Sequence, residues 1–405
     1  MHADVAVIGG GSAGIAAAVG AARKGANVVL IEKYGMLGGM ATTAMVHSIC
    51  GLYLLRADES EPLEFANNGF PREFSELLKK AGGARGPVRM GRLDVLMHNP
   101  KAFAMAADEI LKGLPNVLVL LDTQVTRARR EGNRICGIEI VGKTGSDAIK
   151  SAVVLDTTGD GEVAKLAAAG YDRSPLETLQ RPAYIFSIAG VASSEVSDNG
   201  RLGIARAISY GVSEGHLTEG ALGAAFRAGM TPEQVMVTID LQAPAFDPND
   251  MERLSTAESE GREIAYQLIQ FLKTEIAGFR QASITQLPAR LGIRESRRIH
   301  GIYQLTREDI LNGARFDDEV ALASWPIELR ETARGPRFRF PVDNRPCGIP
   351  GRCLRSKDTE NLFVAGRCIS STHEAQASIR VIGTCLATGE AAGIAAALQS
   401  ESNKA

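Results

Sequence analysis

The sequence predicts an α/β fold that carries a second, mixed α+β domain, and three observations support this prediction. A buried strand near the amino terminus runs straight into a glycine-rich turn and a helix of small residues, over residues 5–22. A strand followed by a small-residue helix recurs near the carboxyl terminus, over 362–398. Between them, strand-like segments at 117–156 are followed by a long amphipathic segment at 251–279. Strands that alternate with helices are typical of a parallel sheet covered by helices.

Length and composition are those of an ordinary globular protein. The chain has 405 residues, enough for two domains with a large core. Apolar residues make up 45%, charged residues make up 23%, and the net charge of −2 does not indicate a nucleic-acid or membrane surface. No apolar run reaches the roughly 20 residues of a membrane span, and no signal sequence precedes the first strand. We therefore expect a cytoplasmic protein without a membrane span.

The cysteines are scattered, which predicts buried thiols in a reducing compartment. They are Cys50, Cys136, Cys347, Cys353, Cys368 and Cys385. None forms a C-x-x-C pair or a zinc pattern, so we expect no metal site. A redox-active pair of Cys347 and Cys353 remains an alternative.

The amino-terminal segment carries the strongest motif. After the strand at 5–8, Gly9, Gly11 and Gly14 match G-x-G-x-x-G. The first glycine permits a tight turn, the second lets the backbone approach a pyrophosphate, and the third lets helix and strand pack closely. The free N–H groups of the following helix terminus, from Ser12 onward, attract phosphate. The motif therefore predicts a Rossmann-like dinucleotide site.

Two further features extend this site. The second strand ends in Glu32, where a carboxylate can bind an adenosine ribose. The following loop, "KYGMLGGMATTAM", lacks helical periodicity, and its Gly38 and Gly39 can bring backbone against a large flat ligand.

The segment resembles the glutathione-reductase-type FAD-binding fold. It is most similar to a bacterial FAD-dependent oxidoreductase family that is distantly related to succinate dehydrogenase and fumarate reductase flavoproteins. The resemblance implies FAD as cofactor and a strand near residue 125 against the adenine, with the "DTTGD" run at 156–160 on the adenosine side. The implied FAD contacts are Gly9, Gly11, Ser12, Ala13, Gly14, Glu32, Lys33, Gly38, Gly39, Met40, Thr42, Val125, Thr158, Gly159, Arg294, Gly366, Arg367, Ile382 and Gly383.

The resemblance and the punctuation of the chain together predict the domain organisation. Residues 1–50, 88–170 and 341–405 are expected to form a discontinuous FAD-binding domain. An excursion rich in glycine and proline is expected at 51–87. Residues 171–340, with strands at 181–191 and 234–244, are expected to form a mixed α+β substrate or cap domain. Its long helix at 251–279 has an apolar side formed by Leu254, Ile264, Leu268 and Leu272.

An arginine-rich segment, "RLGIRESRRIHG", follows the long helix. Lysine is absent from 274–356 while arginine is frequent. Arginine offers a rigid fork of donors for carboxylates, phosphates or flavin edges. A salt-bridged surface that includes Glu295 is the alternative. The resembled family has a similar run, which favours a functional role for Arg294, Arg297 and Arg298.

The loop between the last strand and the last helix is rich in titratable groups. We expect His373 to act as acid or base, because histidine titrates near neutral pH. Glu374 would orient His373 or serve as the base, and Arg380 would hold a substrate anion or neutralise the reduced flavin. The helix from about Val381 should point its positive end at the flavin pyrimidine. A purely structural His373 and a covalent FAD link at His47 are the alternatives.

The chain is therefore expected to be an FAD enzyme that moves a hydride between a small polar substrate and flavin N5. The arginine segment hints at an anionic substrate such as a carboxylate. A separate acceptor, such as a quinone, an electron-transfer protein or oxygen, would reoxidise the flavin. Alternatives are a fumarate-reductase-like reductase of an activated double bond, a flavin monooxygenase, and a non-catalytic flavin-binding partner subunit. A homo-oligomer and a partner subunit both remain open.

Overall fold

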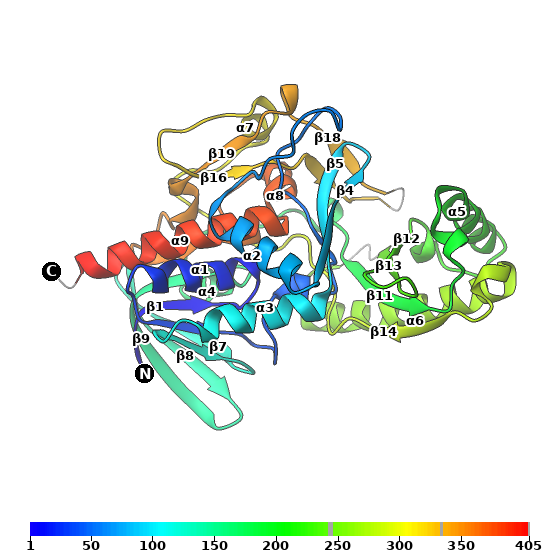
Figure 1. Cartoon of the computed structure of the whole chain (residues 1–405). Helices are drawn as coiled ribbons and strands as arrows, with labels where there is room; N and C mark the ends of the chain where they lie inside the picture. The colour runs from blue at the N-terminus through cyan, green and yellow to red at the C-terminus, as the bar shows by residue number, and fades with distance from the viewer. Residues whose placement is uncertain (242–245, 333–334, 404–405) are drawn as a thin grey trace.

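The computed structural model describes residues 1–241, 246–332 and 335–403. In this part of the chain, seven strands form the sheet at the centre of the larger body (Figure 1). Their order is β6 (Val117–Leu120), β2 (Val28–Ile31), β1 (His2–Ile8), β9 (Gly145–Asp156), β8 (Arg134–Gly142) and β7 (Gln124–Glu131), with β20 (Leu362–Val364) beside β9. Strands β6, β2, β1, β9 and β20 pair in parallel. The predicted α/β fold with a Rossmann-like parallel core is confirmed.

Strand β9 pairs with different strands along its two halves. Its first half pairs with β8, which forms an antiparallel hairpin with β7 around the turn at 132–133. Its second half lies between β1 and β20, where the chain returns from its far end. The parallel edge at Ile8, Asp156 and Val364 therefore comes from three distant parts of the sequence.

Small residues bring the first and last helices into close contact. Helix α1 (Ser12–Arg23) packs on α9 (Ile382–Ser402), as Figure 1 shows. A Cβ at Gly389 would lie 2.2 Å from the Ala13 carbonyl oxygen, and one at Gly393 would lie 2.1 Å from that of Ala17. The glycines thus permit the tight packing expected for the last helix. Helices α2 (Gly69–Lys80), α3 (Pro100–Lys112) and α4 (Glu162–Leu166) belong to the same body.

A separate lobe carries its own sheet and hydrophobic core. Its antiparallel strands are β12 (Ala225–Ala228), β13 (Val235–Asp240), β11 (Ala183–Ala189) and β14 (Ser283–Gln286), with helices α5 (Asp198–Ser213) and α6 (Met251–Glu275). On α6, Leu268 and Leu272 are fully buried, whereas Leu254 and Ile264 are only partly buried against this core. Part of the segment expected as the strand of β13, residues 242–244, lies outside the described residues.

Two stretches differ from the expected boundaries. Strands β3 (Ser48–Ile49), β4 (Ala84–Met90) and β5 (Leu93–His98) form a sheet of their own, which continues across residue 88. Residues from Ile299 to Leu329 place their apolar side chains in the main core rather than in the core of the lobe. This stretch and its neighbours contain β10 (Tyr171–Asp172), β15 (Arg298–Ile299), α7 (Arg307–Asn312), β16 (Glu319–Ala323), β17 (Ile327–Leu329), β18 (Arg337–Arg339) and β19 (Cys347–Pro350).

The last element pair is sharply bent. Helix α8 (His373–Ile379) meets α9 at 94°. Among the described residues, no single helix is long and apolar enough to cross a membrane, and this bent pair meets the criterion by length and composition only.

Candidate active site

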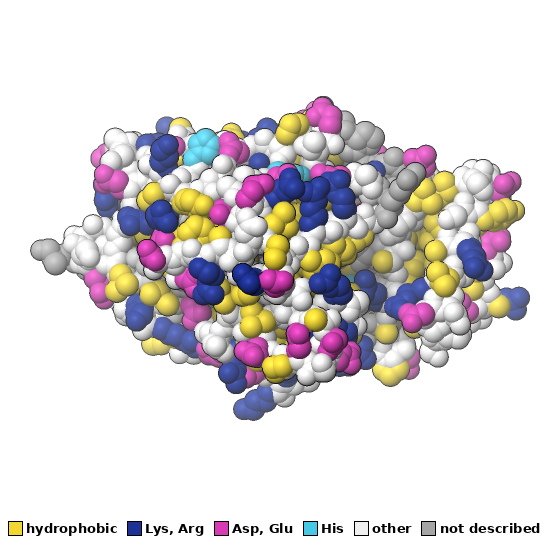
Figure 2. Space-filling view, turned by 90° about the horizontal axis from the view of Figure 1, so that it is seen from above, with side chains coloured by type: hydrophobic (Ala, Val, Ile, Leu, Met, Phe, Trp, Pro, Cys, Tyr) yellow, Lys and Arg dark blue, Asp and Glu magenta, His cyan; other side chains and the backbone are white. Residues whose placement is uncertain are grey.

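A cavity of about 970 Å³ lies where the parallel strands end and the lobe begins. Figure 2 shows the surface hollowed between the lobe that carries α5 and the rest of the molecule, with hydrophobic side chains along the hollow. The predicted FAD contacts that line the cavity are Gly9, Gly11, Ser12, Ala13, Glu32, Lys33, Gly39, Met40, Val125, Thr158, Gly159, Arg294, Gly366, Arg367 and Ile382. Segments from both ends of the chain therefore meet in one site.

The glycine motif forms the floor of this cavity. A Cβ at Gly11 would have no atom within 4 Å, so the backbone there is open to the cavity. Gly11 also caps α1 without a side-chain hydrogen bond, which leaves the helix N–H groups available. By contrast, a Cβ at Gly14 would lie 1.8 Å from the Gly9 carbonyl oxygen. Gly14 thus serves helix packing and does not line the cavity, while the open terminus fits a diphosphate.

The glycine-rich loop after Glu32 lies against this floor. Gly38 forms a bridge with Gly11 and has φ of 105°, which favours glycine. The Thr42 hydroxyl donates to the Leu37 carbonyl at 2.8 Å. Gly38 and Thr42 do not line the cavity, so they shape the loop, while Gly39 and Met40 present it to the cavity.

Glu32 organises the adenosine side. Its carboxylate accepts hydrogen bonds from the N–H groups of Gly10 at 2.7 Å and Tyr34 at 3.0 Å. Burial raises the pKa of Glu32, and these two hydrogen bonds oppose that shift. A carboxylate held in this way at the cavity wall fits ribose hydroxyls.

The "DTTGD" run is both a turn and a wall of the cavity. The buried Asp156 carboxylate accepts from the Thr158 hydroxyl at 2.6 Å and from the Val163 N–H at 2.9 Å. These bonds fix the turn and the start of α4, and leave Thr157, Thr158 and Gly159 facing the cavity.

Arg367 lies at the cavity wall, shortly after the end of strand β20. Its guanidinium donates to the Asp160 carboxylate at 2.6 Å and to the Ile293 carbonyl. Burial raises the pKa of Asp160, but the charges of Arg367 and neighbouring cations outweigh burial and hold it below its usual value. Arg367 therefore lies at the cavity wall as part of a neutral pair.

The amino terminus of α9 also opens on the cavity. Its cap, Val381, makes no side-chain hydrogen bond, and Val381, Ile382 and Cys385 line the cavity. The positive end of a long helix at this place fits negative charge on a bound ring system. Gly383 lies behind the wall, because its N–H donates to the Cys50 carbonyl at 2.9 Å and a Cβ there would meet Gly51.

Beyond this floor lies a chamber, which we define as the part of the cavity bounded by β4, β5, the lobe sheet and the described residues Trp325, Glu328, Arg330, Pro336 and Phe338. The arginines that line it include Arg85, Arg89, Arg227, Arg294, Arg330 and Arg380. Asp240 pairs with Arg294 at 2.6 Å and with Arg330 at 2.7 Å. Glu328 pairs with Arg330 at 2.7 Å. The chamber is therefore rich in guanidinium groups that are partly neutralised.

These residues match a known family over almost the whole chain. The family model described as FAD dependent oxidoreductase matches residues 4–405. The chain belongs to this family. It is accordingly an FAD-dependent oxidoreductase, which sets aside the alternative of a non-catalytic subunit. The distant relation to succinate dehydrogenase and fumarate reductase flavoproteins stays a prediction.

One solved structure shares the fold of this FAD-dependent oxidoreductase, and two others are less similar. The flavin-dependent brominase Bmp2 gives a TM-score of 0.52 at 13% identity, over 99% of this chain and 79% of that one. A geranylgeranyl bacteriochlorophyll reductase-like protein from Thermoplasma acidophilum gives 0.47 at 13% identity, over 100% and 79%. The p-nitrophenol 4-monooxygenase from Pseudomonas putida gives 0.41 at 13% identity, over 91% and 73%. No curated protein matches the sequence.

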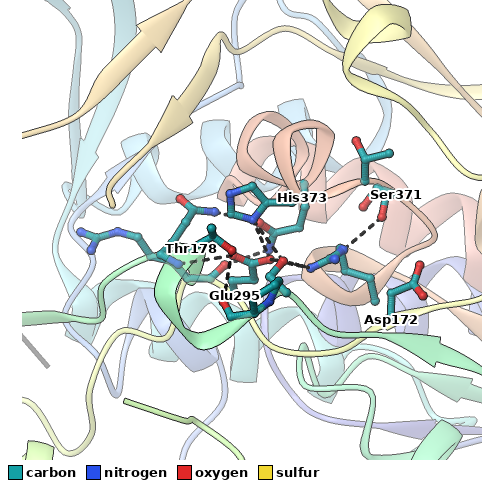
Figure 3. A network of polar contacts seen from close by, with 12 residues as sticks. Asp172, Thr178, Glu295, Ser371 and His373 are labelled. Atoms are coloured by element: carbon teal, nitrogen blue, oxygen red, sulfur yellow. Dashed lines mark hydrogen bonds and ion pairs between the residues drawn. The ribbon is translucent and has the colours of Figure 1, made fainter. Parts of the chain in front are cut away.

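In this oxidoreductase, His373 lies in a polar network outside the cavity lining (Figure 3). Its Nδ1 is 2.9 Å from Glu295, and its Nε2 is 3.3 Å from Glu331. Burial lowers the pKa of His373, but the hydrogen bonds and charge of Glu295, with Glu331, outweigh it and raise the pKa. We expected His373 to face the substrate, but it is not among the residues that line the cavity.

Arg298 and Glu374 are also not among the residues that line the cavity. Arg298 is buried and donates to Glu295 at 2.5 Å and to the Ser371 carbonyl at 3.1 Å. Glu374 lies in the first turn of α8. Thr372 caps that turn, where its hydroxyl accepts from the Ala375 N–H at 3.3 Å. Of the predicted catalytic residues, Arg380 lines the chamber.

The cavity of the oxidoreductase contains one residue that the sequence indicated only as an alternative, His47, and one that it did not single out, Arg227. His47 lines it, with Nδ1 3.4 Å from the Met45 carbonyl, and burial lowers the pKa of His47 to about 4. Arg227, on edge strand β12 of the lobe, lines it as well. A single arginine in a short strand carries no local signal, so only the folded lobe reveals it.

The cysteines favour no redox role. Cys347 and Cys353 are both buried free thiols, and burial raises the pKa of each to about 12. Thiols in that state are poor nucleophiles at neutral pH.

Proposed function

We propose that this oxidoreductase moves a hydride between a small organic substrate and N5 of FAD, and that a separate acceptor reoxidises the cofactor. The observation that carries this proposal is the continuity of the cavity. The dinucleotide floor at Gly11 and the arginine-containing chamber at Arg380 belong to one space. Bound FAD supplies the redox chemistry, while the protein supplies orientation, charge and shielding from water.

His47 is our candidate for the proton acceptor. A donated Nδ1–H to the Met45 carbonyl leaves Nε2 with the lone pair. Burial keeps the imidazole neutral at physiological pH, which leaves this lone pair free, while the same burial disfavours the protonated form. His373 becomes a candidate positioning residue, because it contacts Glu295 and Glu331 rather than the chamber.

Arg380 is our candidate for stabilising negative charge near the reacting atoms. Its Nη2 donates to Gln180 at 3.3 Å and to the Glu328 carbonyl at 3.2 Å, and its buried Nε has no partner among the described residues. It stands directly before the capping Val381 of α9, so the guanidinium and the positive helix end act in the same region.

The first experiment is the visible spectrum of the purified protein, repeated on supernatant and pellet after acid precipitation. We expect flavin in the supernatant with the mass of FAD. Colour left in the pellet would indicate covalent attachment, with His47 as first suspect. A colourless protein that takes up no added FAD would contradict the proposal.

The second experiment compares anaerobic flavin reduction in His47→Gln and His373→Asn with a panel of small alcohols, amines and hydroxy acids. We expect about 10²-fold or greater slowing in His47→Gln, as for loss of a general base, and only a small change in His373→Asn. If both changes slow flavin reduction equally, His373 would again be a candidate for the catalytic acid or base.

A flavin monooxygenase is the second candidate. The apolar chamber walls favour it, because such chemistry needs a site poor in water. The same anaerobic assay separates the classes: reduction by the substrate itself indicates a dehydrogenase or oxidase. Reduction by NAD(P)H indicates a monooxygenase or the reverse reaction, a reductase of an activated double bond.

A further inference from the structure

The charges inside the chamber do not balance. Among the arginines that line it, Arg294 and Arg330 pair with the buried carboxylates Asp240 and Glu328, and Arg89 pairs with Asp94. Arg227 and Arg380 form no direct ion pair with a described residue, although the charge of Glu328 reaches both. Their guanidinium charges are therefore only partly neutralised.

Both of these arginines are half-buried. The Arg227 guanidinium has the Met90 sulfur, at 3.2 Å, as its hydrogen-bond acceptor among the described residues. Burial lowers the pKa of Arg227, and lowers that of Arg380 to about 10. Burying an unpaired cation is costly, and such groups are normally paired. A site that keeps two of them is complementary to an anion.

The two arginines also lie near one shared feature of the wall. The Cys50 thiol lies within electrostatic reach of both Arg227 and Arg380, and all three residues line the cavity. Arg227 comes from the lobe sheet, and Arg380 comes from the bend before α9. An anion between them would join the two bodies of the molecule.

Much of the remaining chamber wall is apolar, although Arg85 and Arg89 of β4 also line it. Its apolar side chains come from β4, β5, the lobe sheet and the described residues between 325 and 338. These residues are Val88, Met90, Leu93, Ile185, Phe226, Trp325 and Phe338. A highly polar ligand such as a sugar would leave its hydroxyl groups without partners against such a wall.

We propose that the chamber binds an organic carboxylate with an apolar body, whose carboxylate lies between Arg227 and Arg380. This rests on the proposed function, because it names the substrate class of that site. Two guanidinium groups with free N–H donors suit a single carboxylate, and the apolar wall suits the carbon skeleton. The sequence hinted at an anion from the arginine run at 290–298, but the residues that hold it are elsewhere.

The test is isothermal titration calorimetry of the FAD-loaded protein with phenylacetate, phenylacetamide and acetate. We expect phenylacetate to bind about ten- to a hundredfold more tightly than the amide, as for a charge-assisted hydrogen bond. It should also bind more tightly than acetate. Equal affinity for acid and amide in the wild type, or no binding of phenylacetate, would overturn the proposal.

Variants locate the carboxylate. Arg227→Met and Arg380→Met should each lose the preference for the acid, while Arg206→Met, an exposed arginine on α5, should keep it. Arg227→Gln replaces Arg227→Met if the latter does not retain FAD. If both Arg227→Met and Arg227→Gln keep the preference for phenylacetate over phenylacetamide, the assignment of Arg227 to the carboxylate is overturned. Failure of the wild type to take up FAD contradicts the proposed function, whereas a flavin-loaded protein without acid preference contradicts this inference alone.

Discussion

The guanidinium of Arg367 lies 2.6 Å from the Asp160 carboxylate and directly against Gly159, where a Cβ would approach Arg367 Nη2 to 2.9 Å. This contact joins the last strand of the parallel sheet to the turn after β9, and so closes the cavity on the adenosine side. It also explains why glycine stands at 159, where φ is 74°.

Arg367→Met should destabilise the fold and weaken FAD binding. The change leaves Asp160 buried without its main partner, which costs about 3–5 kcal/mol. Thermal unfolding and FAD titration measure the two effects. The double variant Arg367→Met/Asp160→Asn should recover part of the stability, and an additive loss in the double variant would contradict this account of the pair.

Two glycines of the motif should separate cofactor binding from folding. Gly11→Ala places its methyl group in open cavity space, so we expect an unchanged melting temperature of the apoprotein and about tenfold weaker FAD binding or more. Gly14→Ala, the matched control, drives its methyl into the Gly9 carbonyl and should cost about 3 kcal/mol. Equal affinity for FAD in Gly11→Ala and wild type would remove Gly11 from the diphosphate site.

His98 should limit stability in acid. It is fully buried beside Phe103, neither ring nitrogen has a partner among the described residues, and burial lowers its pKa to about 3. The unfolded chain therefore takes up this proton first, and stability falls as the pH drops from about 6.5 toward 3, by about 2 kcal/mol at pH 5.

His98→Leu should remove that loss and stabilise the protein at neutral pH by about 1–3 kcal/mol, because it removes unpaired polar atoms. Urea unfolding at pH 7 and pH 5 measures both effects. An unchanged pH dependence in the variant would mean that the ring gains a partner in solution.

The effect of His373 on stability should have the opposite pH dependence to that of His98. Its pKa in the fold is raised, because the contacts with Glu295 and Glu331 outweigh burial. The stability that it contributes is present below the unfolded pKa of about 6.5 and is lost as the pH rises through the folded pKa. The difference in unfolding free energy between wild type and His373→Asn should therefore shrink as the pH rises above about 6.5. A constant difference would contradict a protonated His373.

The sequence by itself determined the dinucleotide site. The motif consists of Gly9, Gly11 and Gly14, with Glu32 at the end of the next strand. A local motif of this kind can be recognised without knowing which distant segments it contacts. The return of the chain at 362 and the long helix of the lobe were predictable for the same reason. The acid/base assignment was less secure, because a histidine in a loop says nothing about the direction of its side chain.

The tertiary structure alone decided which side chains share the chamber. Arg227 on a short edge strand, His47 behind the glycine-rich loop and Arg380 at the bend before α9 come together only when the lobe docks on the parallel sheet. The same docking turns His373 and Arg298 toward the buried Glu295 and away from the chamber. Charge pairing between segments far apart in sequence depends on three-dimensional distance, so no reading of spacing along the chain could have predicted which arginines remain unpaired.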